Sequence, residues 1–263
     1  IIAIPRDVSD AMAVERMAAE IEARLGRTSI LVNAAGIFGP IALIRDVDPV
    51  EWQRTVMIDA VAPLFTARAF LGGMLDQGWG RIVNVTSAAA LHPPGPLNSA
   101  YGTAKAALNQ MTRHLAAEIA GSGVTANVIH PGDVKTEMWA DIKQRVAGTG
   151  AAGENYSSWV AWVEETGGDP PEKAVDLVLR LTSDVGAGTN GEFCWIEDPL
   201  QSPVDSWELF CGRTSQVRRL VDAVTQGGLH AVLYGERGVG KTSLVNVVGP
   251  VLTASFPDSQ FVV

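Results

Sequence analysis

The stretch RIVNVTSAAALHPPGPLNSAYGTAK, residues 81–105, contains a strand, a loop and the start of a helix. RIVNV is a mostly apolar run, the pattern of a strand that is buried on both faces of a parallel sheet. The prolines of HPPGP, residues 92–96, predict a loop between the strand and the helix. From Tyr101, apolar residues recur at helical spacing up to Gly121. A buried strand followed by a helix is the repeating unit of a parallel α/β sheet.

The same alternation of strand and helix continues on both sides of this stretch. Upstream, one helix is expected to be capped by Ser9, and a longer one begins at Asp48 with a bend expected at Pro63. A further helix begins at Asp169, whereas residues 137–168 are expected to be irregular. The expected strands are residues 1–5, 29–33, 81–85, 124–132 and 191–196. We therefore predict an α/β fold in which helices cover both faces of a doubly wound parallel sheet.

Composition narrows the class of protein. The 263 residues are 47% hydrophobic and 19% charged, which excludes a disordered or fibrous chain. The formal net charge of -9 argues against nucleic acid or an anionic membrane surface as a partner. Apolar runs stay shorter than the roughly 18 residues of a membrane helix. The two cysteines, Cys194 and Cys211, fit free thiols in a reducing compartment, so we expect a cytoplasmic protein.

Charge is distributed unevenly along the chain. Residues 1–200 carry 24 acidic and 15 basic residues, a net charge of -9, whereas residues 201–263 carry 5 of each. We predict one unit at 1–200, a polar linker at 201–208 and a second unit at 209–263. The chain begins and ends in strand-like runs, IIAIP and FVV, so the first unit is expected to be incomplete at its N-terminus and the second at its C-terminus.

A tyrosine, a lysine and a serine indicate acid–base chemistry at this sheet. Tyr101 and Lys105 are four residues apart and share one helix face. A neighbouring ammonium lowers the pKa of a tyrosine from about 10, which lets the phenol exchange a proton with a substrate oxygen. Ser87 follows a strand at the carboxyl edge of the sheet, where open α/β folds bind ligands. On its own, the YxxxK motif is better explained by an ordinary helix with a partly buried tyrosine.

The wider sequence resembles the short-chain dehydrogenase/reductase family over residues 1–200. Five motifs carry this resemblance in the family's order: DVSD at 7–10, LVNAAG at 31–36, RIVNVTS at 81–87, YGTAK at 101–105 and HPGDVKT at 130–136. The resemblance implies a Rossmann-type sheet and hydride transfer between NAD or NADP and a small secondary alcohol or carbonyl compound.

The resemblance also implies a role for each matching residue. Tyr101 would be the general acid or base, and Ser87 would orient the substrate oxygen. Lys105 would lower the pKa of the tyrosine and bind the nicotinamide ribose. Asp59 stands at the position of the family's fourth catalytic residue, an asparagine. The implied cofactor contacts are Asp7, Val8, Asn33, Ala34, Ala35, Gly36, Tyr101, Lys105, Pro131, Gly132, Val134 and Thr136.

Two substitutions depart from the family's pattern. Ala34 replaces the second asparagine of the NNAG motif, and Asp59 replaces the asparagine that helps to hold a proton-relay water. The backbone of Asp59 can keep the relay role, but its charge can also raise the pKa of Tyr101. Whether the proton relay is kept is therefore left open, whereas the acid–base pair of Tyr101 and Lys105 is intact.

Residues 1–200 lack a counterpart of the family's first strand, its TGxxxGxG phosphate loop, its first helix and its second strand. The choice between NAD and NADP is made at the end of that second strand, so it stays open. Without those strands, residues 1–5 would have no partner and the edge of strand 29–33 would be bare. We therefore expect this 263-residue chain to be poorly soluble, inactive and unable to bind NAD(P).

Aromatic residues are concentrated in residues 137–168, the position of the family's substrate lid. They are Trp139, Tyr156, Trp159 and Trp162. They are consistent with an apolar or ring-shaped substrate. An equally good explanation is that they fill the core or the interface of a homo-oligomer.

A second motif, GERGVGKT at residues 235–242, matches GxxxxGK[ST] and follows the strand-like run 229–234. Its glycines let backbone N–H groups surround a phosphate at a helix N-terminus. The expected phosphate contacts are Gly235, Gly238, Gly240, Lys241, Thr242 and Ser243. Thr242 would also bind the Mg²⁺ of ATP or GTP. LFCGR at 209–213 resembles the entry of AAA-like and STAND-type NTPases, but the sequence supplies no argument for hydrolysis.

Three hypotheses cover the whole chain. The first is an NAD(P)-dependent short-chain oxidoreductase fused to a P-loop NTPase. The second is a nucleotide-driven signalling protein whose first unit binds NAD(P) as a sensor or effector without turnover. The third is that the fusion joins two neighbouring genes artificially. Intact Ser87, Tyr101 and Lys105 favour the enzyme, and Asp59 leaves room for the sensor.

Overall fold

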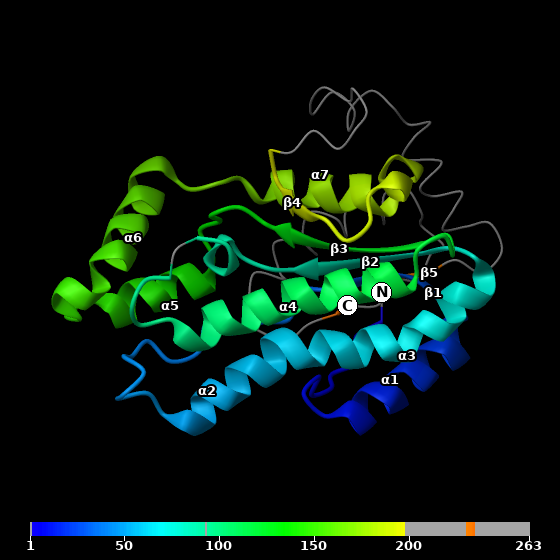
Figure 1. The fold of residues 1–263 in the computed structure, drawn as a ribbon, viewed down its shortest axis with the longest axis horizontal. Helices are drawn as coiled ribbons and strands as arrows, with labels where there is room; N and C mark the ends of the chain where they lie inside the picture. The colour runs from blue at the N-terminus through cyan, green and yellow to red at the C-terminus, as the bar shows by residue number, and fades with distance from the viewer. Residues whose placement is uncertain (1, 93, 198–229, 235–263) are drawn as a thin grey trace.

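The computed structural model describes residues 2–92, 94–197 and 230–234 (Figure 1). A five-stranded parallel sheet lies at its centre, with the strand order β4-β3-β2-β1-β5. The strands are β1 (Thr28–Asn33), β2 (Gly80–Val85), β3 (Val124–His130), β4 (Phe193–Trp195) and β5 (His230–Tyr234). The predicted parallel α/β sheet is therefore confirmed.

Helices cover both faces of the sheet (Figure 1). On one face, α1 (Ala11–Leu25), α3 (Ala62–Gln77) and α4 (Ser99–Glu118) pack with Leu31 of β1 and Ile82 of β2. On the other face, α7 (Pro171–Thr182) packs against Ile30 and Val32 of β1 and Val83 of β2. Successive strand residues thus enter opposite cores, which is why the strands are apolar almost throughout.

The long helix predicted from Asp48 is one helical run with a π-helical turn in its middle. The run consists of α2 (Pro49–Val56), a π-helical turn (Met57–Val61) and α3. The backbone N–H of Ala62 donates to the carbonyl of Met57, the five-residue spacing of a π-helix. The irregularity therefore lies just before Pro63, which sits in the first turn of α3. The run is long and apolar enough to cross a membrane by composition, but it packs against α1, α4 and the sheet as a core helix.

The prediction that residues 137–168 are irregular is wrong. They form α5 (Glu137–Val146), a short 3-10 turn (Gly150–Gly153) and α6 (Glu154–Thr166). Thr136 caps α5 by accepting a hydrogen bond from the backbone of Trp139. The two helices pack on each other through a separate apolar cluster that includes Trp139 and Val163. The short lengths of these helices and the glycines between them hid the helical period.

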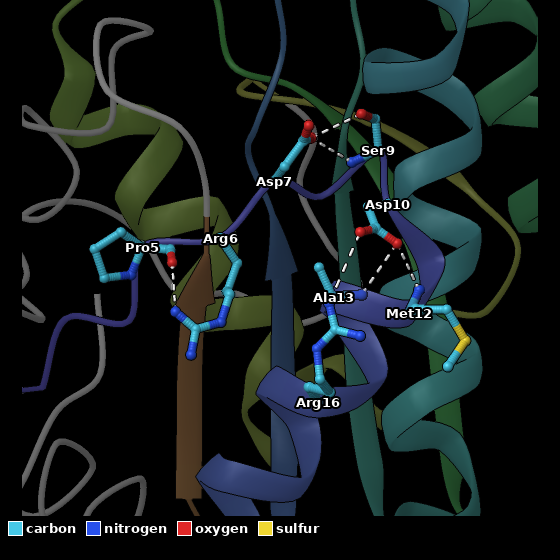
Figure 2. A network of polar contacts seen from close by, with 8 residues as sticks. All are labelled: Pro5, Arg6, Asp7, Ser9, Asp10, Met12, Ala13 and Arg16. Atoms are coloured by element: carbon cyan, nitrogen blue, oxygen red, sulfur yellow. Dashed lines mark hydrogen bonds and ion pairs between the residues drawn. The ribbon is translucent and has the colours of Figure 1, made fainter.

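The start of the chain differs from the prediction in two details. Asp10, not Ser9, caps α1: its carboxylate accepts hydrogen bonds from the backbone of Met12 and Ala13, as Figure 2 shows. Asp7 accepts hydrogen bonds from the backbone and hydroxyl of Ser9. Residues 2–5 belong to none of the named strands, but Ile4 is buried in the core beside α1 and α3.

The expectation of a bare edge on β1 is also wrong. β5 pairs with β1 in parallel, with Asn33 opposite Tyr234. The strand that covers this edge comes from a part of the chain that the sequence assigns to the second unit. The predicted linker and the remainder of the second unit lie outside the described residues, so that division of the chain stays a prediction.

Buried polar side chains join the sheet to the helices that carry the site. The Asn33 amide donates to the Asn84 carbonyl oxygen at 2.8 Å, and the Asn84 amide donates to the Thr112 hydroxyl on α4 at 2.8 Å. The Thr66 hydroxyl on α3 donates to the other side of Asn33 at 2.7 Å. These contacts satisfy polar groups that would otherwise be costly to bury, so they fix α3 and α4 against β1 and β2.

Candidate active site

A cavity of about 500 Å³ lies at the carboxyl ends of β1, β2 and β3. Parallel strands end at the same edge, so residues that follow them meet there. Ala34 and Gly36 follow β1, Ser87 follows β2, and Pro131 follows β3; all four line the cavity. α4 contributes Tyr101 and Lys105, and α5 and α6 form an apolar wall. The structure therefore brings the predicted serine, tyrosine and lysine to one site.

Ser87 is held by the turn that begins there. It is the N-cap of a short 3-10 helix (Ala88–Ala90), and its hydroxyl accepts a hydrogen bond from the backbone of Ala89 at 3.2 Å. The same hydroxyl lowers the pKa of the Tyr101 phenol, so it acts on that phenol. Ser87 is thus fixed just after the end of β2 by its own turn.

Tyr101 and Lys105 lie on the first turns of α4, as their spacing predicts. Both are buried: Tyr101 is 9% exposed and Lys105 is 4% exposed. The Tyr101 ring lies 4.9 Å from the ring of Phe38, centre to centre, and the Lys105 ammonium lies 5.5 Å from the Tyr101 ring centre. The ammonium donates to the carbonyl oxygen of Val85 at 3.0 Å.

Asp59 supplies the charge partner of Lys105. It lies on the π-helical turn and is fully buried. One carboxylate oxygen, Oδ2, lies 3.1 Å from the Lys105 Nζ, and the other accepts a hydrogen bond from the backbone of Ile37 at 2.8 Å. The sequence identifies Asp59 as a candidate but gives no sign of this ion pair.

Burial changes the acid–base balance that the sequence predicts. It raises the pKa of Tyr101, as does the Asp59 carboxylate, whereas the Lys105 ammonium and the Ser87 hydroxyl lower it. The net direction is upward: Lys105 lowers the pKa of Tyr101 as predicted, and Asp59 raises it, which is the alternative that the sequence left open. Burial alone would lower the pKa of Lys105, but Asp59 and Tyr101 outweigh it, and Lys105 is held in its charged form.

The predicted cofactor contacts fall into two groups. Six line the cavity besides Tyr101 and Lys105: Ala34, Gly36, Pro131, Gly132, Val134 and Thr136. Asn33 and Ala35 are not among the lining residues, and the Asn33 amide belongs to the buried polar network. Val8 is buried in the core, and the Asp7 carboxylate, which is not among the lining residues, accepts hydrogen bonds from Ser9 (Figure 2).

Several cavity residues were not predicted. Phe38 contacts the rings of both Tyr101 and Tyr156, and His92 and His130 also line the cavity, each beside the ring of Trp195. His130 is the last residue of β3, so its place directly before Pro131 and Gly132 is the signal that points to the edge of the sheet. Its ring nitrogen Nδ1 accepts a hydrogen bond from the backbone of Ala88 at 3.3 Å, and burial lowers its pKa.

The aromatic residues of α5 and α6 divide between the cavity and the surface. Trp139, Tyr156 and Trp159 line the cavity, whereas Trp162 is 46% exposed. Met138 and Ile142 complete the apolar wall. Most of the predicted aromatic set is therefore placed where it would contact a bound molecule.

The cavity fits the nicotinamide end of a dinucleotide together with a small substrate. Small residues, Ala34 and Gly36, leave space beside the Lys105 ammonium. A hydroxyl, a phenol and an ammonium converge on that space, which suits a ribose and a substrate oxygen. Within the part of the chain that the structure describes, there is no group of three or more His, Cys, Asp or Glu side chains that could hold a metal ion. The predicted phosphate contacts at 235–243 lie outside the described residues.

Comparisons with known proteins agree with this geometry. The sequence profile described as short chain dehydrogenase matches residues 1–147. Galactitol 2-dehydrogenase (L-tagatose-forming) from Cereibacter sphaeroides is 39% identical over 192 residues, which cover 72% of this chain and 71% of that protein. The 2-keto-3-deoxy-L-fuconate dehydrogenase of Xanthomonas campestris pv. campestris is 33% identical over 190 residues, or 71% of this chain and 60% of that one.

Solved structures show the same fold. NAD⁺-bound xylitol dehydrogenase superimposes with a TM-score of 0.65 at 23% identity, covering 73% of this chain and 76% of that one. Gluconate 5-dehydrogenase from Burkholderia cenocepacia J2315, in complex with NADP and tartrate, gives a TM-score of 0.62 at 25% identity, covering 72% and 71%. The chain spans only 43% to 60% of the length of three curated relatives that it matches.

Proposed function

The chain belongs to the short-chain dehydrogenase/reductase family, and from this we propose that the protein is an NAD(P)-dependent oxidoreductase for secondary alcohols or carbonyl compounds. The observation that carries the proposal is the meeting of Ser87, Tyr101 and Lys105 at one cavity. Because the chain covers about half the length of several relatives, the activity is proposed for the protein with whatever further sequence its gene encodes.

Each polar residue of the site has a task in this reaction. Tyr101 gives a proton to the substrate oxygen or takes one from it. Ser87 orients that oxygen and stabilises the charge that develops on it. Lys105 holds the ribose and keeps a positive charge beside the phenol. The bound nicotinamide supplies or accepts the hydride.

The cofactor and substrate are proposed from the lining of the cavity. Ala34, Gly36, Pro131, Gly132, Val134 and Thr136 are proposed to contact the cofactor, with Asp7 and Val8 at its adenine end. Solved relatives include one with NAD⁺ and one with NADP, so both are candidates. The aromatic wall of Trp139, Tyr156 and Trp159 favours a substrate with an apolar or ring-shaped body.

Turnover of the nicotinamide cofactor tests the proposal. The protein is mixed with NAD⁺ or NADP⁺ and a panel of secondary alcohols, or with the reduced cofactors and the matching ketones. We expect the absorbance of the reduced nicotinamide to change only when cofactor and substrate are both present. Binding of the cofactor without turnover of any ring-shaped or linear substrate would instead favour the sensor hypothesis.

We also propose that residues 235–243 bind the phosphates of ATP or GTP with Mg²⁺. The support is the GxxxxGK[ST] pattern together with β5, a strand that ends directly before Gly235. Replacement of Lys241 by alanine should abolish binding of a fluorescent ATP analogue, because the lysine of GxxxxGK[ST] is the residue that reaches the β- and γ-phosphates. The matched control is Lys173→Ala, the same replacement at a surface lysine that forms an ion pair with Asp169. Equal binding by both variants would contradict the proposal.

A further inference from the structure

We propose that Asp59 is a positioning residue that acts through Lys105: its carboxylate holds the ammonium, cancels part of its charge, and so sets the pH range in which Tyr101 exchanges its proton. The inference rests on the proposed function for the role of Tyr101. The effect of Asp59 on the Tyr101 phenol does not depend on the proposed function, because it can be measured without turnover.

The position of the Asp59 carboxylate is fixed from three sides. Its Oδ2 is 3.1 Å from the Lys105 Nζ, and its Oδ1 accepts the backbone N–H of Ile37 at 2.8 Å. A side chain at Gly36 would start 3.1 Å from that Oδ2 and 3.3 Å from the ammonium, so the glycine backbone closes over the pair. The Asp59 and Lys105 side chains are 0% and 5% exposed. The contact is therefore a buried, geometrically constrained ion pair.

The π-helical turn explains why Asp59 reaches this place. A π-helical turn inserts an extra residue into a helix and changes the direction in which side chains leave it. Here it spans Met57–Val61, and Asp59 is its central residue. This turn packs against α4, the helix that carries Lys105 and Tyr101. The irregularity thus coincides with the one carboxylate that contacts the ammonium among the described residues.

The ion pair between Asp59 and Lys105 changes the electrostatic environment of the Tyr101 phenol. A lone buried ammonium beside Tyr101 would stabilise the phenolate strongly, because water does not screen it. With Asp59 in contact, the ammonium is part of a nearly neutral pair, and the carboxylate itself opposes the phenolate. Burial, the attraction of Lys105 and the repulsion of Asp59 together leave the pKa of Tyr101 raised. The attraction of the Lys105 ammonium for the Tyr101 phenolate, on which the acid–base chemistry depends, is therefore present but reduced.

Other titratable groups around the cavity do not take the place of Asp59. Tyr156 on α6 interacts with Tyr101, and burial raises its pKa, so it stays neutral over the working range. His92, His130 and Asp133 also line the cavity, but the groups that shift the pKa of Tyr101 are Lys105, Asp59 and Ser87. Ser87 contributes a neutral hydroxyl to the phenol.

The test replaces Asp59 with asparagine, which keeps the shape of the side chain and removes its charge. The protein contains three tyrosines, so the ionisation of Tyr101 can be isolated from phenolate absorbance by subtracting the spectrum of the same protein with Tyr101→Phe. We expect the apparent pKa of Tyr101 to fall by about one unit in D59N, because loss of a negative charge in a poorly screened site is worth at least that much. The pH at which the oxidation rate is half-maximal should fall equally.

Two further variants complete the experiment. D48N makes the same chemical change at the exposed N-cap of α2, where asparagine also caps well, and should leave the titration unchanged. D59S removes the charge with a smaller side chain and should move the titration in the same direction as D59N. An unchanged or higher pKa of Tyr101 in both Asp59 variants would overturn the inference. A lower pKa in a protein without turnover would support the inference and reject the proposed function.

Discussion

Replacement of Tyr101 by phenylalanine should reduce kcat of the proposed oxidoreductase by about 10²- to 10⁴-fold, the usual contribution of a positioned general acid or base. The change removes one hydroxyl and leaves the ring, which packs 4.9 Å from Phe38 centre to centre. Fold and cofactor affinity should therefore stay close to those of the unchanged protein. The measurement is steady-state turnover together with a cofactor-binding titration.

The matched control for this change is Tyr156→Phe. Tyr156 lines the same cavity from α6, packs on the same Phe38 and loses the same hydroxyl. We expect at most a small change in kcat for this variant. If both variants lost activity equally, the proton-transfer role would not belong to Tyr101. If Tyr101→Phe left the biological activity of the protein intact, the hypothesis of a sensor without turnover would be favoured.

Replacement of Lys105 by methionine should lower the free energy of unfolding by about 3–5 kcal/mol, the usual loss when one partner of a buried ion pair is removed. Methionine fills most of the space, but the Asp59 carboxylate loses its ammonium partner and keeps the backbone N–H of Ile37. Urea unfolding followed by circular dichroism measures the loss. The double variant K105M/D59N should recover most of it, because no unpaired charge then remains buried.

The pH dependence of this variant has a definite sign. Burial already raises the pKa of Asp59, and Lys105 opposes that effect, so removing Lys105 should raise the pKa further. A carboxyl whose pKa is higher in the folded state binds a proton that the unfolded chain releases, so stability falls as pH rises. The loss in K105M should therefore be largest near neutral pH and smaller under acidic conditions. A double variant no more stable than K105M would contradict this account.

Much of the site could be predicted because its residues are close in sequence or follow strands. Tyr101 and Lys105 share a helix face by their spacing, and Ser87 follows a strand that ends at the same edge of the sheet. The ion pair between Asp59 and Lys105 could not be predicted, because it depends on the packing of two helices that are distant in sequence. The same is true of Phe38, which belongs to a loop and reaches Tyr101 only through the tertiary fold.

The fold was predictable in its class and less so in its details. Apolar strands alternating with helices are enough to indicate a parallel sheet. They do not determine which strand pairs with which, so the pairing of β5 with β1 was missed. Helices α5 and α6 were missed because each is short and glycines separate them, and because their aromatic residues obscure a regular apolar period.

The π-helical turn at Met57–Val61 makes the site sensitive to the number of residues in a helix as well as to their identity. Deletion of one residue there would restore regular α-helical hydrogen bonding and remove the extra residue that changes the direction in which the side chains of this segment leave the helix. Asp59 could then no longer face Lys105, although every residue with a chemical role would still be present. Natural variants that differ by one insertion or deletion in this segment would therefore lose more activity than variants that differ by a conservative substitution.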